Sequence, residues 1–125
     1  GLSEERKQEV ARQVGVGAEA GHHVDGVGTV VRFDPVGDNR LLEISAPEEL
    51  AKYIARKGSI TVSGVSLTTN AVDGCRFAIN LIPHTLASTT LGGRRAGDRV
   101  NLEIDLIARY VERMLNPEAE PAQNA

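Results

Sequence analysis

Hydroxyl groups at alternating positions are the first feature of this sequence with binding chemistry. Ser66 and Thr68 flank Leu67, so in an extended chain both hydroxyl groups face the same side, where each can donate and accept a hydrogen bond. Asp105 follows the run VNLEI, and its carboxylate can accept hydrogen bonds from two hydroxyl groups at once. The structural alternatives are a solvated strand face for Ser66 and Thr68, and a helix cap for Asp105.

The histidines favour proton transfer over metal binding. A histidine titrates near neutral pH and can act as a general base, although a single histidine on an edge strand, such as His23, is more often solvated. Adjacent strand residues point to opposite faces, so His22 and His23 do not form a ligand pair. We treat His84 as solvated. Because Cys75 is the single cysteine, we expect neither a zinc ligand set nor a disulfide.

Composition and general motifs exclude several functions. With 14 Lys+Arg against 17 Asp+Glu, the net charge is -3, which argues against a nucleic-acid-binding surface. No run approaches the roughly 18–20 apolar residues of a membrane span, and the first residues are charged where a signal peptide would be apolar. The GVG segments lack the strand and helix context of a dinucleotide site. We therefore expect a cytoplasmic protein with no nucleic-acid or membrane partner.

Strands must position these side chains, since residues 22–104 are mostly typical of β-structure. Six strand-like runs follow at short spacing, and Ser63-Gly64 between two of them is a two-residue hairpin signal. The segment APEELAKYIARKG interrupts them as a short helix, with Pro47 in its first turn and one apolar face: Leu50, Tyr53 and Ile54. So many strands in a short chain favour an all-β closed barrel, because closure removes exposed edges.

A helix is predicted after the last strand, over residues 105–115. Asp105 is its expected N-cap, and a broad apolar stripe runs along it: Leu106, Ile107, Tyr110, Val111 and Met114. The stripe either closes an open end of the barrel or packs on another subunit. These alternatives stay open from the sequence.

The two ends of the chain differ from the middle. Residues 1–20 are predicted to form a short helix and a flexible linker of small residues. Residues 116–125 contain two prolines and almost nothing to bury, which predicts a disordered tail. Residues 21–115 would then form the barrel with its C-terminal helix.

Four blocks resemble the C-terminal barrel of riboflavin synthase in order and spacing: HVDGVGTV, KGSITVSGVSLTTN, LIPHTLASTTLG and GDRVNLEIDLIARYVERML. The resemblance covers about residues 21–115. It implies a six-stranded antiparallel Greek-key barrel with short helices and a C-terminal helix. His22 stands where the family has a glycine, and Ser63 where it usually has an aspartate.

The resemblance implies an activity as well. Riboflavin synthase joins two molecules of 6,7-dimethyl-8-ribityllumazine by moving a four-carbon unit, which gives riboflavin and a ribitylaminopyrimidinedione without cofactor or metal. The family enzyme is a trimer with two barrels per subunit, and its site lies between the N-terminal barrel of one subunit and the C-terminal barrel of another. This chain resembles one barrel only, so full activity would need a second.

Matched motif positions imply the site residues. His23 corresponds to a histidine near the reacting centre, where an acidic methyl group must lose a proton. The alternative to a substrate contact is a surface charge for Lys57 and a cap of its turn for Thr85. Gly58 is expected to allow a tight turn, and Asp105 to bind the ribityl chain. Substrate contacts are implied for Lys57, Gly58, Ser66, Thr68, Ile82, Thr85 and Asp105.

Three functions remain as alternatives. The chain is a riboflavin synthase-type transferase module, a non-catalytic lumazine- or flavin-binding protein, or an engineered or truncated barrel without turnover. One barrel holds one ligand whereas the reaction pairs two, so we expect a homodimer, with a helix-mediated trimer as the alternative.

Overall fold

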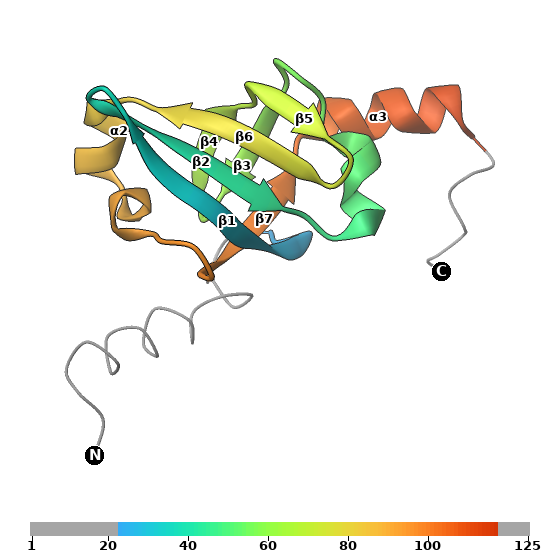
Figure 1. Ribbon diagram of the computed structural model, residues 1–125. Coiled ribbons are helices and arrows are strands. Elements are labelled where there is room, and N and C mark those ends of the chain that lie inside the picture. Colours follow the sequence, from blue (N-terminus) through green and yellow to red (C-terminus); the bar gives the residue numbers. More distant parts are fainter. Residues whose placement is uncertain (1–22, 118–125) are drawn as a thin grey trace.

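One strongly curled antiparallel sheet makes up most of the molecule. The computed structural model describes residues 23–117, so the predicted N-terminal helix and linker (1–20) and most of the predicted tail lie outside the described residues. The sheet order is β4-β3-β7-β1-β2-β6-β5 (Figure 1). Its strands are β1 (Gly26–Val36), β2 (Asn39–Ser45), β3 (Ser59–Val62), β4 (Val65–Thr68), β5 (Ala71–Asp73), β6 (Arg76–Leu81) and β7 (Arg99–Ile104). The predicted all-β antiparallel fold is confirmed.

The seventh strand arises because one predicted strand is bent. β4 and β5 stand at opposite ends of the sheet order, yet only Thr69 and Asn70 separate them along the chain. The N–H of Thr69 donates to the carbonyl of Gly58 at 2.9 Å, on the β3 side, and the N–H of Asn70 donates to the carbonyl of Ala78 at 2.7 Å, on β6. The two sheet edges are thus parts of one bent strand, and six strands form a ring.

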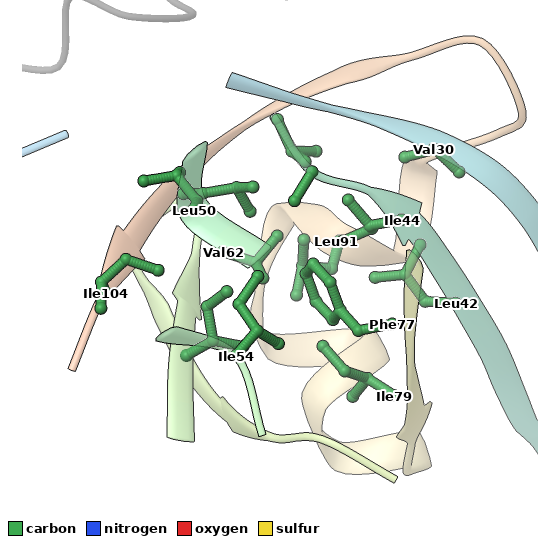
Figure 2. Close-up of a cluster of buried hydrophobic side chains, with 14 of the residues drawn as sticks. Val30, Leu42, Ile44, Leu50, Ile54, Val62, Phe77, Ile79, Leu91 and Ile104 are labelled. Carbon is green, nitrogen blue, oxygen red and sulfur yellow. The ribbon is translucent and has the colours of Figure 1, made fainter. Parts of the chain in front are cut away.

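Short helical turns fill the ends of the ring. The helix predicted around Pro47 is the 3-10 helix η1 (Glu48–Tyr53), whose three residues per turn place Leu50 and Tyr53 on the same buried face. On the other side, α2 (Pro83–Ser88) leads into η2 (Thr90–Gly93), from which Leu91 enters the core with no exposed surface. Figure 2 shows Leu50 and Leu91 converging with residues from the strands: Val30, Leu42, Ile44, Val62, Phe77, Ile79 and Ile104.

Helix α3 (Leu106–Leu115) does not close the barrel. It extends beyond the sheet and contacts η1 (Figure 1). Its apolar stripe is exposed, from 48% at Val111 to 78% at Met114. Of the two alternatives for this stripe, the one in which it fills a barrel end is therefore wrong, and Leu50 and Tyr53 of η1 are buried there instead. No helix within residues 23–117 is long and apolar enough to cross a membrane.

The predicted Ser63-Gly64 hairpin is confirmed. Val62 pairs with Val65, and the two residues between them both have positive φ angles, 48° at Ser63 and 84° at Gly64. Positive φ at both central positions is the type I′ turn, which matches the twist of the flanking strands. Ser63 occupies a position that asparagine or aspartate fills with less strain.

Replacing Ser63 with asparagine should therefore stabilise the protein. We expect Ser63→Asn to raise the free energy of unfolding by about 0.5–1 kcal/mol, because the left-handed conformation costs a typical residue about 1–2 kcal/mol and asparagine less. Urea denaturation of the two chains measures the difference. Ser88→Asn, at an exposed position of α2, is the control, and an equal effect at both sites would contradict this account.

Candidate functional site

Two rows of polar side chains cross the outer face of strands β4, β3 and β7. Ser66 and Thr68 are both exposed while Val65 and Leu67 are half-buried, so the two hydroxyl groups share the outer face as predicted. Ser66 pairs with Thr61 on β3, and Thr61 in turn pairs with Glu103 on β7. These three side chains form the first polar row.

The second polar row lies two residues further along the strands. Thr68 pairs with Ser59, and continuing the β3–β7 register by one residue sets Ser59 beside Asp105. Each row thus ends in a carboxylate. Ser59, Thr61 and Glu103 were not among the predicted site residues. The two-residue spacing of Glu103 and Asp105 was a signal that both side chains face one side of the strand.

The Asp105 carboxylate is only weakly engaged as a helix cap. It accepts a hydrogen bond from the N–H of Ile107 at 3.5 Å, which is long for an N–H···O bond. Asp105 also lines a groove of about 340 Å³ between α3 and η1, together with Gly58 and Ser59. The carboxylate therefore keeps acceptor capacity next to an open space.

The turn that carries Lys57 and Gly58 is tight for a different reason than predicted. Lys57, not Gly58, has the left-handed conformation, with a φ angle of 69°. Glycine is favoured at position 58 because a Cβ atom there would lie 3.0 Å from the carbonyl oxygen of Ala55, which accepts the N–H of Gly58 at 2.9 Å. Thr69 fixes this turn, since its carbonyl accepts the N–H of Lys57 at 3.0 Å and its hydroxyl donates to the Ala55 carbonyl. The exposed Lys57 side chain thus starts from a strained backbone.

Ile82 and Thr85 lie where β6 passes into α2. Ile82 is the N-cap residue of α2 and is 50% exposed. The alternative of Thr85 as a turn cap is wrong, because α2 has no side-chain cap and Thr89 caps the following turn by accepting the N–H of Leu91 at 3.2 Å. Extending the β5–β6 register by four residues brings Leu67 opposite Ile82, but β4 pairs only with β3 among the described strands. The extended register, and no observed pairing, thus relates the start of α2 to the unpaired edge of β4.

His23 lies next to the first polar row, beside Thr61 and Glu103. It lines a small hollow together with Thr61 and Glu103. Its ring is 70% exposed, and its Nε2 atom lies 2.7 Å from Oδ1 of Asp25. The structure thus brings His23 to the face that carries Ser66, Thr68 and Asp105.

Asp25 is a nearly buried carboxylate beside this face, with 5% of its side chain exposed. Oδ2 accepts the N–H of Ile104 at 2.7 Å, and Oδ1 accepts a hydrogen bond from the guanidinium of Arg109. Burial pushes the pKa of Asp25 upward, but the hydrogen bonds from Ile104 and His23 and the charge of Arg109 together hold that pKa below its ordinary value. Asp25 is therefore a carboxylate at neutral pH.

Comparison with known proteins agrees with this architecture. Residues 21–105 match the lumazine binding domain. Riboflavin synthase of Photobacterium phosphoreum is 44% identical over 93 residues, 74% of this chain and 43% of the relative; that of Brucella abortus is 45% identical over 114 residues, 87% of this chain and 56% of the relative. The chain spans about half the length of these relatives.

Solved structures show the same fold. The crystal structure of LumP complexed with 6,7-dimethyl-8-(1'-D-ribityl) lumazine superposes with a TM-score of 0.64 at 26% identity, over 66% of this chain and 47% of LumP. LumP complexed with riboflavin gives the same score and identity, over 66% of this chain and 45% of that one. The ring of strands, the domain match and the identities to riboflavin synthase together show that the chain belongs to the lumazine-binding domain family.

Proposed function

We propose that this chain binds 6,7-dimethyl-8-ribityllumazine and riboflavin on the outer face of β4, β3 and β7. The observation that carries the proposal is the pair of polar rows that end in Glu103 and Asp105. A ribityl chain presents several hydroxyl groups, and carboxylates and hydroxyls two residues apart can accept and donate along it. Crystal structures of LumP complexed with ribityllumazine, flavin mononucleotide and riboflavin support this ligand class.

The heterocycle would lie against the unpaired edge of β4. Backbone N–H and C=O groups there can serve the polar edge of a pyrimidine ring, as a neighbouring strand otherwise would. Ile82 offers an exposed apolar side chain for the flat ring face, and Thr85 a hydroxyl nearby on α2. Lys57, held in its strained turn, would reach a ring oxygen.

Beyond ligand binding, we propose that the chain catalyses the riboflavin synthase reaction, and the placement of His23 favours this. A His23 ring that donates from Nε2 to Asp25 keeps Nδ1 as a proton acceptor, which is the arrangement of a general base and its orienting carboxylate. The base would take a proton from the methyl group of one bound lumazine. Because two lumazines must meet, we propose that two barrels pair as a homodimer, with a trimer through the exposed stripe of α3 as the alternative.

Loss of the Asp105 carboxylate should weaken binding of the ribityl chain. We expect Asp105→Ala to reduce riboflavin affinity by about 1–3 kcal/mol, the usual range for hydrogen bonds to a charged group, and Thr68→Val to cost less. Riboflavin fluorescence, titrated with each chain, measures both affinities. Asp73→Ala, on the exposed strand β5 away from the rows, is the control. If Asp105→Ala binds as tightly as the parent, the ribityl assignment is wrong.

Lys57 permits a test in which stability and affinity move in opposite directions. Lys57→Gly removes the left-handed strain, so we expect about 1 kcal/mol of added stability, together with a loss of riboflavin affinity of about 1 kcal/mol. Thermal unfolding and the same fluorescence titration report the two quantities. Arg56→Ala removes an equal charge from the neighbouring exposed residue and should leave affinity unchanged. Added stability without lost affinity would identify Lys57 as a surface charge.

Turnover and assembly should appear together. Incubating the chain with 6,7-dimethyl-8-ribityllumazine and following riboflavin absorbance measures turnover, and sedimentation at micromolar concentration measures mass. We expect a dimer with slow turnover, because two copies of one barrel lack whatever side chains a different barrel would supply. Binding with no riboflavin formed would favour the non-catalytic function. A species of only 13.3 kDa would refute the dimer and, with it, catalysis by the chain alone.

A further inference from the structure

We propose that Asp25 is the positioning residue of the ligand-binding face, because one carboxylate binds His23, the backbone N–H of Ile104 next to Asp105, and Arg109 of helix α3. The inference deepens the proposed function and rests on it for the identity of the ligand. Asp25 itself lies behind the polar rows, at the start of β1. Its role is to fix the groups that would touch the ligand.

The two oxygens of Asp25 divide their partners between distant parts of the chain. Oδ1 meets His23, two residues away, and Arg109, 84 residues away, while Oδ2 meets the N–H of Ile104, 79 residues away. The N–H of Asp25 also donates to the carbonyl of Leu102 at 2.8 Å. Asp25 is therefore held in place by its own backbone, and its acceptor geometry is fixed.

Asp105 is positioned through the residues on both sides of it. The N–H of Ile104, which precedes it, is bound by Asp25, and its own carbonyl accepts the N–H of Arg109 at 3.2 Å. The Arg109 guanidinium in turn lies 5.1 Å from the centre of the Tyr53 ring, in cation–π range. The contacts from Asp25 through Arg109 to Tyr53 thus link the residue before β1 to α3 and η1.

Helix α3 buries little of its surface against the barrel. None of its residues is buried: Ala108 packs against the core, and the large apolar side chains of α3 stay half or more exposed, from 48% at Val111 to 78% at Met114. The ion pair of Asp25 and Arg109 and the contact of Arg109 with Tyr53 therefore help to attach α3 to the barrel, beside the packing of Ala108 on the core. Since α3 forms one wall of the groove that Asp105 lines, loss of this anchor should move that wall.

Burying the Asp25 carboxylate costs free energy, and a gain in stability alone does not explain why the protein keeps this charge in a nearly buried position. A buried ion pair is weak evidence for stability, because well-packed apolar residues often do as well, whereas its geometry is specific. Here the specific outcome is that two candidate site residues, His23 and Asp105, depend on one carboxylate. In metal sites, removing a group that orients the ligands costs about tenfold or more in affinity, and we expect an effect of that order here.

The test compares Asp25→Asn with the parent in the full chain, by amide hydrogen exchange and by riboflavin titration. We expect the Ile104 amide and the amides of α3 to exchange about tenfold faster, and the riboflavin Kd to rise about tenfold. Asp34→Asn is the matched control, because Asp34 pairs with Arg32 at 3.0 Å but is 51% exposed. It should change neither readout.

A double variant separates positioning from stability. Asp25→Asn leaves the Arg109 charge without its buried partner, and adding Arg109→Gln removes that charge, so we expect the double variant to regain stability but not riboflavin affinity. Recovery of affinity with stability would overturn the positioning role. So would unchanged exchange at Ile104 and in α3. If the parent itself fails to bind riboflavin, the proposed function fails, and the exchange rates alone decide whether Asp25 holds Ile104 and α3.

Discussion

Closure of the barrel depends on how one threonine is held. Thr69 is 1% exposed, and its hydroxyl donates to the Ala55 carbonyl while its backbone pairs with Lys57 and Gly58. A buried hydroxyl has to find a partner, and an unsatisfied one costs about 1–3 kcal/mol. This requirement fixes the bend between β4 and β5. Because the strand turns there from β3 toward β6, the six-strand ring closes, and within residues 23–117 one edge of β4 is left without a strand partner.

Local features of the fold were predictable because their causes are local. The Ser63-Gly64 hairpin depends on two residues and their φ angles. The outward hydroxyls of Ser66 and Thr68 follow from the two-residue period of a strand, and the buried face of η1 from the spacing of Leu50 and Tyr53. The family resemblance, confirmed by the domain match, implied the antiparallel barrel that these pieces form.

Features that depend on register or on distant contacts were not predictable from the sequence. Glu103 joins the site only because β7 pairs with β3 in one register, and Asp25 reaches partners 79 and 84 residues away. The amphipathic pattern of α3 predicted an apolar face but could not specify what that face contacts. Likewise, a Lys-Gly sequence suggests that glycine takes the unusual conformation, whereas the hydrogen bonds to Thr69 impose it on Lys57.

The unpaired edge of β4 has a consequence for how the protein behaves in concentrated solution. An open strand edge is a template on which another chain can add a strand, and proteins commonly limit this hazard with short edges. β4 is only four residues long, yet its backbone groups are the same ones a bound heterocycle would use. A ligand seated there would compete directly with strand addition by a second chain. Ligand and intermolecular aggregation would then be rivals for one edge, so the empty barrel would be the form most prone to aggregate.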